Sequence, residues 1–512
     1  IQATDLIVNM TGKTGFSSAD MNITVTGGTA ADVITTGLGD DTFTGGNGGD
    51  TFTIIGGDNT ITDLSNNGAA DVVTLAAGAT VVGTMGGAYT ATSATKNLGS
   101  AVADFEIIQG GSLALSLDAA TVTTAATDGF TVTTSSSGNT IGSDGNDAIT
   151  STGTGALLGG IGVDTITNTS GASTITGGPG ADVLVGGSAI ETFFFALTAD
   201  LFTSSAIVDS ITGNGAVDII AGGTTGTAFT IAGTDVWTRA STVESIVPVA
   251  NNAAVSITLD STAAAAGIRT VDLSAMTSTS GNVIDVSELS VAMTLIGAAI
   301  TGNTTITGGG GVDTILAGVA SSSVTGGLGA DLITGAGGTD TIIMTGSVGG
   351  VDEITTFTSA TDIVHIDISD IEGLSGYTDI VGLNSISLAQ GAASATVMSG
   401  STGGSAYDLN SATGDEILQV PAAASASALE TALEVGGSDA LTANSAFAVG
   451  DTILVVYDDG TDSYLAAVAT SATIANNATI AAGTLTATNI VKFVGISNAV
   501  SGLATADFVL IS

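Results

Sequence analysis

Apolar residues in this chain fall in short runs, where Val, Ile, Leu or Phe alternates with Thr or another polar residue. Typical runs are NITVT at 22–26, DTFT at 50–53 and DTIT at 164–167. Strict alternation over four to eight residues buries one face of an extended segment and exposes the other, so these runs predict strands. Glycine clusters separate the runs and predict tight turns. The pattern therefore indicates an all-β chain of short strands.

The glycine clusters and the strands together form a nine-residue repeat, Gly-Gly-x-Gly-x-Asp-x-apolar-x. The clearest copies are GGNGGDTFT at 45–53, GGIGVDTIT at 159–167, GGPGADVLV at 177–185 and GGLGADLIT at 326–334. A short fixed period means that each repeat is one structural unit that must stack on its neighbours. Three blocks contain such repeats, at 27–62, 138–194 and 299–343.

Charge narrows the possible partners of the chain. The 512 residues include 48 acidic and five basic side chains, which gives a formal net charge of −43. Without a basic surface the chain cannot replace the counterions of a nucleic acid, and direct docking on anionic lipid is disfavoured. A divalent cation could still join it to an anionic polysaccharide. No apolar run is long enough for a transmembrane helix, and the absence of cysteine excludes disulfides.

The nonapeptides resemble those of the RTX (repeats-in-toxin) family, whose members are secreted, calcium-binding parallel β-rolls. Calcium takes six to eight oxygen ligands, and the motif offers an Asp carboxylate and glycine carbonyls. The resemblance implies that the carboxylate ligands are Asp32, Asp41, Asp50, Asp147, Asp164, Asp182, Asp313, Asp331 and Asp340. The glycines that it implies are Gly28, Gly37, Gly39, Gly46, Gly48, Gly160, Gly162, Gly178, Gly180, Gly309, Gly311, Gly327 and Gly329. The pattern departs from the motif at Ala30, which stands in a glycine position, and at Ser173 and Ser322, which stand in acid positions.

The spacing of the acids predicts how the sites are distributed. In an 18-residue coil of two nonapeptides, acids nine residues apart fall on opposite edges. Ser173 and Ser322 replace every second acid of blocks two and three, and Glu191 stands in the acid position of a degenerate copy. We therefore expect blocks two and three to bind calcium mainly along one edge, and block one along both.

Other segments predict the domain organisation. Segments 61–75, 208–220 and 351–366 resemble the strands that close RTX rolls, and we expect Asp71, Asp218 and Asp362 to cap their turns. The predicted order is a first roll with closing strands at 1–75, a β linker module at 76–137, a second roll at 138–220, a second linker module at 221–298, a third roll at 299–372 and a β domain at 373–512. The fold class is thus an elongated, all-β chain of parallel β-roll or β-helix blocks joined by β linkers.

The last region has no nonapeptides. It predicts a short helix between Pro421 and Gly436 with Leu429 and Leu433 on one face, a hairpin at 452–468 and a strand at 489–496. The closing residues ADFVLIS resemble the ends of RTX proteins exported by type I secretion. At the other end, the chain starts with Ile1 without a signal-peptide pattern, so we interpret it as part of a longer polypeptide or as a processed form.

Three common kinds of catalytic motif are absent from the sequence. His365 is the single histidine and lies in an alternating strand, so we interpret it as structural; HExxH, GxSxG and cysteine-nucleophile chemistry are absent. Trp237, the single tryptophan, is interpreted as a core residue. The expectation is that the protein is not an enzyme.

The whole pattern is similar to bacterial RTX-containing surface-layer (S-layer) proteins. The resemblance implies a structural protein at the cell surface that needs Ca²⁺ to fold and that assembles with copies of itself. Two alternatives stay open. One is an RTX adhesin or matrix filament with a binding patch near Trp237 or the Tyr457/Tyr464 hairpin. The other is the non-catalytic C-terminal part of a secreted RTX enzyme.

Overall fold

The computed structural model describes most of the chain and divides it into two compact units. Unit one contains Ile1–Gly223, Thr234–Val247 and Ala265–Ile268, and unit two contains Thr224–Gly233, Pro248–Ala264 and Arg269–Ser512. The described residues are 7–9, 22–64, 71–75, 79–87, 89–90, 95–96, 104–109, 112–117, 121–122, 129–203, 206–224, 226–249, 254–276, 281–297, 302–344, 350–359, 361–367, 386–388, 396–399, 416–420, 423–434, 441–443, 447–475, 478, 480–497, 503 and 507–511.

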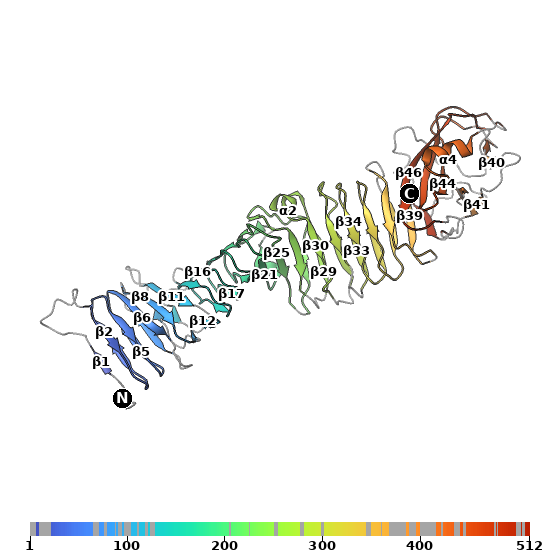
Figure 1. Ribbon diagram of the computed structural model, residues 1–512. Helices are drawn as coiled ribbons and strands as arrows, with labels where there is room; N and C mark the ends of the chain where they lie inside the picture. Colours follow the sequence, from blue (N-terminus) through green and yellow to red (C-terminus); the bar gives the residue numbers. More distant parts are fainter. Residues whose placement is uncertain are drawn as a thin grey trace. The chain divides into compact units, whose positions relative to one another are not determined.

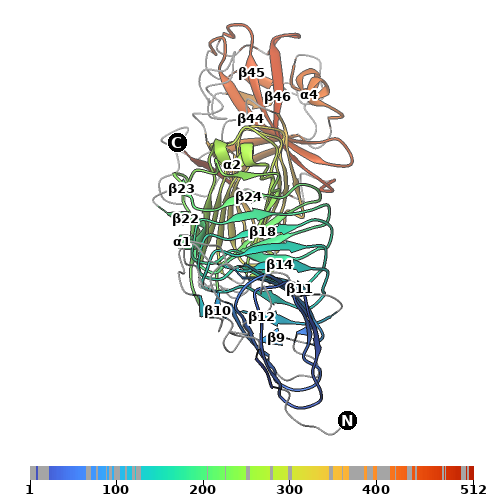
Figure 2. The ribbon, with the colours of Figure 1, turned by 90° about the vertical axis from the view of Figure 1, so that its left-hand side faces the viewer.

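Unit one is built from three parallel sheets, whose strands stack turn upon turn (Figures 1 and 2). The first sheet contains β1 (Ile7–Asn9), β3 (Val33–Thr35), β5 (Thr51–Ile54), β7 (Val72–Leu75), β10 (Thr95–Lys96) and β13 (Thr121–Val122). The second contains β2 (Thr24–Thr26), β4 (Thr42–Thr44), β6 (Asp58–Leu64), β8 (Thr80–Met85), β11 (Asp104–Gln109), β14 (Thr131–Thr134), β16 (Ala148–Ser151), β18 (Thr165–Asn168), β20 (Val183–Val185), β24 (Ser210–Thr212) and β27 (Ala240–Ser241). The third contains β9 (Tyr89–Thr90), β12 (Leu115–Ser116), β15 (Thr140–Ile141), β17 (Leu157–Leu158), β19 (Thr174–Thr176), β21 (Thr192–Phe195), β25 (Ile219–Gly222) and β28 (Ser245–Pro248).

The number of strands per turn changes along unit one. From β2 to β7 the chain alternates between the first and second sheets, and from β14 to β21 it alternates between the second and third. Between these two rolls, β8 to β13 visit all three sheets in turn. The segment predicted as a linker module at 76–137 therefore continues the stack, because β8 pairs with β6 and β11 pairs with β14. The division of the chain into six domains remains a prediction.

The core of unit one is the line of apolar residues that alternate with outward-facing Thr. Ile34, Phe43 and Phe52 are fully buried in the first roll, as are Ile166 and Leu184 in the second. Each lies two positions after a motif acid, where the sequence places the inward side chain. The predicted all-β parallel-roll architecture is confirmed.

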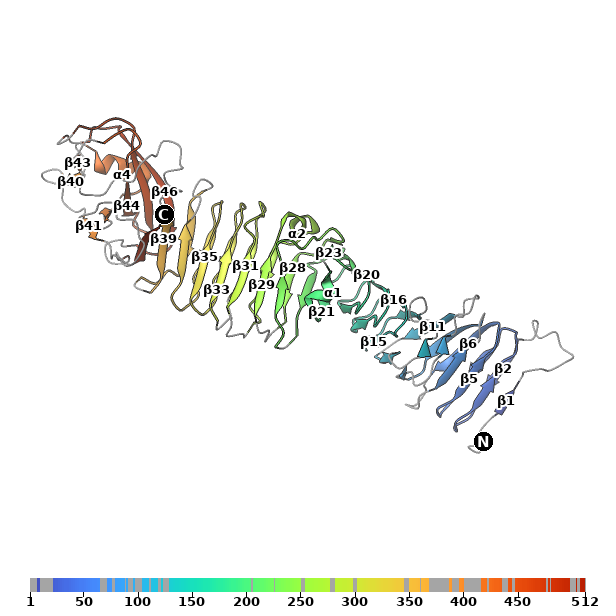
Figure 3. The same cartoon turned by 180° about the vertical axis from the view of Figure 1, so that it is seen from behind.

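Unit two continues the same architecture with two parallel sheets (Figure 3). One sheet contains β30 (Thr270–Asp272), β32 (Thr294–Ile296), β34 (Thr314–Leu316), β36 (Leu332–Thr334) and β38 (Asp352–Thr355). The other contains β26 (Phe229–Ile231), β29 (Val255–Thr258), β31 (Asn282–Asp285), β33 (Thr304–Thr307), β35 (Ser322–Thr325), β37 (Thr341–Met344) and β39 (Ile363–Asp367).

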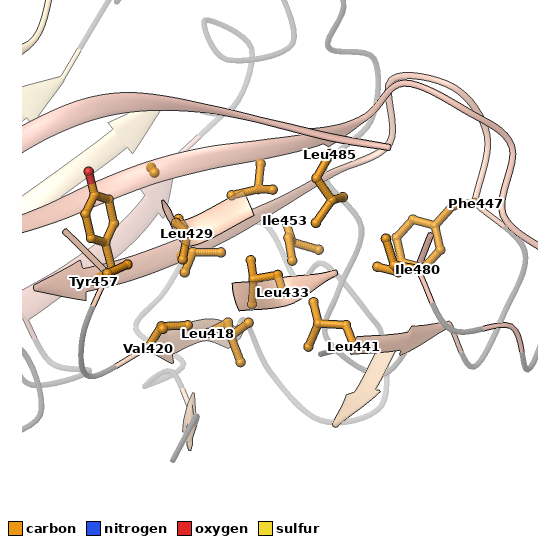
Figure 4. Packing of buried hydrophobic residues seen from close by; sticks show 14 of the residues in the cluster. Leu418, Val420, Leu429, Leu433, Leu441, Phe447, Ile453, Tyr457, Ile480 and Leu485 are labelled. Atoms are coloured by element: carbon orange, nitrogen blue, oxygen red, sulfur yellow. The ribbon is translucent and has the colours of Figure 1, made fainter. Parts of the chain in front are cut away.

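The C-terminal region of unit two is a mostly antiparallel group around the predicted hairpin. Its strands are β41 (Thr396–Ser399), β42 (Glu416–Val420), β44 (Thr452–Asp458), β45 (Ser463–Thr470) and β46 (Leu485–Phe493). The hairpin β44–β45 and the predicted helix are confirmed as elements: α4 spans Ala426–Leu433, and the Ser425 side chain caps its first turn by accepting from Ala428 N–H. The proposed ends of that helix, Pro421 and Gly436, lie outside the described residues. Leu429 and Leu433 pack under β44 in one apolar cluster (Figure 4).

The last two strands of the chain join the parallel sheets. β46 pairs with β38, and β47 (Phe508–Ile511) pairs with β39, both in parallel. The strand edges of the final roll turn are therefore covered by chain from the C-terminal region.

The remaining elements are short. They are α1 (Thr198–Leu201), the antiparallel pair β22 (Phe202–Thr203) and β23 (Ala206–Ile207), α2 (Ser261–Ala266), and the antiparallel pair β40 (Ile386–Leu388) and β43 (Leu441–Ala443). Within the described part of the chain, no helix has the length and apolarity that crossing a membrane requires.

Candidate metal centre

The motif acids of the first roll form vertical rows, one at each edge of the stack. Asp32 N–H donates to Asp50 Oδ1 at 2.7 Å, and Asp50 N–H donates to Asp71 Oδ1 at 2.8 Å. At the opposite edge Asp41 N–H donates to Asn59 Oδ1 at 3.3 Å. One side-chain oxygen of Asp50, Asp71 and Asn59 thus accepts from the backbone of the preceding turn.

The second roll repeats this arrangement with a longer row. Asp147, Asp164 and Asp182 donate their backbone N–H groups to the Oδ1 atoms of Asp164, Asp182 and Asp209 at 2.7, 2.7 and 2.8 Å. The opposite edge also carries acids, since Glu191 N–H donates to Asp218 Oδ1 at 2.8 Å and Asp218 N–H donates to Glu244 Oε2 at 2.9 Å.

The roll of unit two has acids at both edges as well. Asp313 N–H donates to Asp331 Oδ1, and Asp331 N–H to Asp352 Oδ1, both at 2.8 Å. Across the roll, Asp340 N–H donates to Asp362 Oδ1 at 3.0 Å. We expected one edge to dominate in blocks two and three, yet buried acids line both edges. Ser322, which lacks a carboxylate, keeps the backbone part of the pattern by donating to Asp340 Oδ1 at 2.9 Å.

The second oxygen of several row acids has no partner. Six buried Oδ2 atoms in the described residues accept no hydrogen bond, and they belong to Asp41, Asp164, Asp182, Asp209, Asp218 and Asp331. These side chains are at most 1% exposed. A buried, unpaired carboxylate oxygen is costly, so each of these positions suits a cation.

Backbone carbonyl oxygens lie beside these carboxylates because glycine leaves room for them. A methyl group built on Gly159 would lie 2.2 Å from Asp164 Oδ2 and 2.7 Å from the carbonyl oxygen of Gly177 in the next turn. One built on Gly178, where φ is +109°, would lie 2.0 Å from Gly160 O. At Gly159, a carboxylate oxygen and a carbonyl oxygen therefore lie close to the same point. At Gly178, the short distance shows how closely the backbones of neighbouring turns approach each other.

The donor set fits calcium. Among the described residues no group of three or more His, Asp, Glu or Cys side chains converges on one point. The clustered groups are instead a carboxylate with a backbone carbonyl oxygen of the next turn beside it, both of them the hard oxygen ligands that Ca²⁺ prefers. When bound, the ion supplies positive charge that offsets the mutual repulsion of the stacked acids. The predicted carboxylates all lie in these rows, and the predicted glycines lie in the turns that carry them.

Burial and mutual repulsion shift the acids toward the protonated form in the absence of a cation. Burial, together with the nearby carboxylates of Asp147, Asp182 and Asp209, raises the pKa of Asp164 to about 8. A hydrogen bond from Asp147 N–H opposes the shift. Burial likewise raises the pKa of Asp209 to about 7 and that of Asp331 to about 6. These carboxyl groups therefore compete for protons near neutral pH.

The predicted ligand set omitted several members of the rows. Asp209 and Asp352 each extend a row by one turn, and Asp71, Asp218 and Asp362, expected to cap turns, accept the same backbone hydrogen bond as motif acids. The usable signal was the second half of the motif, x-Asp-x-apolar, in VDSIT at 208–212 and VDEIT at 351–355. The motif glycines are all missing before Asp209, and before Asp352 only Gly350 stands in a glycine position of the motif.

The residues considered for other roles are mainly internal. Trp237 is 1% exposed and packs edge-on against Phe202, and Tyr457 is 1% exposed and stacks on Tyr464. Of the three aromatic residues named for an adhesin patch, Trp237 and Tyr457 are therefore buried, and Tyr464 is partly exposed. His365 lies half-buried on β39, where burial lowers its pKa.

Comparison with known families agrees with the geometry of the rows. A family model described as the RTX calcium-binding nonapeptide repeat (4 copies) matches residues 24–52, 158–189 and 307–342. A search of curated proteins found no match to the chain.

Proposed function

We propose that this chain, which carries RTX calcium-binding nonapeptide repeats on a parallel β-roll, is a secreted, non-enzymatic structural protein. In this proposal, copies of the chain assemble with one another into a calcium-dependent surface layer on a bacterial cell. The observation that carries the proposal is repetition. Rows of buried acids recur through both units, so calcium is distributed along the stacked turns and is not confined to one reactive centre.

Charge supports the dependence on calcium. A chain with 48 acidic and five basic residues repels its own copies, and a divalent cation reduces that repulsion. Extracellular calcium modules bind with Kd values of about 10⁻⁴–10⁻³ M. The acid rows would therefore be unfilled in a low-calcium cytosol and filled outside the cell, which couples folding and assembly to export.

The test is negative-stain imaging of the purified chain, titrated from chelator into millimolar calcium. Circular dichroism of the same samples reports the content of β structure. We expect β structure to increase with calcium and ordered two-dimensional sheets to form. Folded monomers at every calcium concentration would overturn the assembly proposal, and full β structure in chelator would overturn calcium-dependent folding. One-dimensional fibres would favour a matrix filament protein over a surface-layer protein.

A further inference from the structure

Two turns at the opposite edge of the second roll carry acids that lie outside the matched repeats. These turns, GGSAIE at 186–191 and GNGAVD at 213–218, place Glu191 and Asp218 in the position of the motif acid. The family match ends at residue 189. Both acids are 0% exposed, and they are stacked directly, since Glu191 N–H donates to Asp218 Oδ1 at 2.8 Å.

The backbone of the second turn copies the motif without its second glycine. Asn214 has a φ of +92°, close to the values of +117° and +109° at Gly160 and Gly178. Asparagine tolerates this left-handed region better than most residues. Its side-chain amide donates to Gly186 O at 3.1 Å and ties the two turns together.

The oxygen arrangement also matches the motif turns. A methyl group built on Gly186 would lie 2.5 Å from Gly213 O and 2.7 Å from Glu191 Oε2. The equivalent group on Gly159 in a motif turn meets the same pair, its own acid at 2.2 Å and the carbonyl of the next turn at 2.7 Å. Beside the first glycine of each turn, a carboxylate oxygen and a carbonyl oxygen therefore lie close to the same point.

Buried oxygen atoms without partners lie in this cluster. With both carboxylates ionised, Asp218 Oδ2 accepts no hydrogen bond, and neither does Oδ1 of the fully buried Asn168. The Glu191 and Asp218 side chains lie close enough to share a hydrogen bond when one of them is protonated. The amide nitrogen of Asn168 lies 3.4 Å from Glu191 Oε1, so the Asn168 side chain belongs to the same group. Asn168, Glu191 and Asp218 together offer an oxygen-rich site with two formal negative charges, and two of its oxygens are unsatisfied.

We propose that Glu191 and Asp218, with the carbonyl oxygen of Gly213, hold a calcium ion at this second edge. Carboxylate, carbonyl and amide oxygens are the ligands of a hard divalent cation, and burial makes the uncompensated pair costly. The second roll then binds calcium along both edges, although its second edge has lost the consensus motif. This inference rests on the calcium binding of the repeats and does not require assembly of the chain.

The test measures bound calcium per chain by equilibrium dialysis of the full-length protein at saturating calcium. The double variant Glu191→Gln/Asp218→Asn should bind one ion fewer than the parent protein. Asp200→Asn removes an acid from the segment between the two turns, outside the cluster, and should leave the number unchanged. Asp164→Asn should lose an ion from the motif edge and shows that the assay detects a single site.

Two further measurements keep the result interpretable. Circular dichroism in calcium reports whether the double variant folds, and the single variant Glu191→Gln, which should also lose the ion, replaces it if the double variant does not fold. An unchanged ion count in a folded double variant, or in a folded Glu191→Gln, overturns this site while leaving the repeats intact. A parent protein that binds no calcium overturns both this site and the proposed function.

Discussion

At the scale of the residue, the two carboxylate oxygens of a row acid have different roles. Oδ1 accepts the backbone N–H of the preceding turn, as Asp182 does from Asp164 at 2.7 Å. Oδ2 has no protein partner in Asp164, Asp182 and Asp209. Replacing Asp by Asn keeps an oxygen that can accept the backbone hydrogen bond and removes the charge. The substitution therefore separates the structural role from cation binding.

Asp164→Asn should have opposite effects on stability with and without calcium. With calcium at a hundredfold excess over Kd, loss of one site should remove about 3 kcal/mol of stabilisation. In chelator at pH 8 the variant should be more stable than the parent protein, because a buried charge among three other carboxylates is gone. Denaturant unfolding in both conditions measures the two effects.

The matched control is Asp144→Asn, which removes an exposed acid from the turn that carries Asp147. It should change unfolding little in either condition. A destabilised Asp164→Asn in chelator would contradict the expected reversal of sign.

The raised carboxyl pKa values also predict how the metal-free protein responds to pH. Burial raises the pKa of Asp164 to about 8, and those of Glu191 and Asp352 to about 7. Between the unfolded values near 4 and these folded values, the folded state binds more protons than the unfolded state. The stability of the metal-free fold should therefore fall as pH rises from about 4 to about 8, and then level off.

Circular dichroism of calcium-free protein between pH 5 and 8 checks this expectation. The β signal, or the midpoint of unfolding, should be greater at pH 5. Added calcium should reverse the trend at pH 8, because the cation competes with protons for the same oxygens. Equal stability across the pH range in the absence of calcium would count against buried, unfilled sites.

At the scale of the element, the turn depends on glycine only where the next turn comes close. Gly178 has a φ of +109°, and a methyl group there would lie 2.0 Å from Gly160 O. A methyl group on Gly28, another predicted ligand, meets no atom within 4 Å. The same residue type at the same motif position is therefore constrained to different degrees in different turns.

Gly178→Ala should destabilise the second roll by about 2 kcal/mol or more, since strain of a left-handed non-glycine residue adds to a backbone clash. It should also weaken calcium binding by pushing two turns apart. Gly28→Ala is the control and should have a small effect on both. Thermal unfolding and a calcium titration of the two variants provide the comparison, and equal effects would mean that turn spacing is not limiting.

The sequence predicted the acids that recur at regular spacing. It missed the acids that reach the same row after an irregular insertion. Nine-residue spacing placed Asp164 and Asp182 in one row, because period and edge follow directly from 18-residue turns. It did not place Asp209, because α1 and the β22–β23 pair interrupt the chain before that acid rejoins the row. The insertion lengthens the chain between Asp182 and Asp209. The two acids still lie in neighbouring turns, because the strands that follow them pair in parallel with Val183 opposite Ser210.

At the scale of the whole molecule, stacked turns leave strand edges that must be covered. Parallel stacks expose unpaired backbone groups at their ends, and such edges invite pairing with other chains. Here β46 and β47 pair with β38 and β39, and Lys492 on β46 forms an ion pair with Glu353 at 3.0 Å. The closing residues ADFVLIS, which resemble an export signal in sequence, also supply a strand of the folded unit.

The vertical spacing of the acids has an electrical consequence. Neighbouring strands are about 4.8 Å apart, so each edge of a roll carries up to one carboxylate per 4.8 Å of stack. Two unit charges in water repel with an energy equal to RT at a separation of about 7 Å. A fully ionised edge is therefore a line charge dense enough to gather counterions from solution. Monovalent salt should screen it and lower the apparent affinity for calcium, and every ion that binds should ease the ionisation of the acids above and below it.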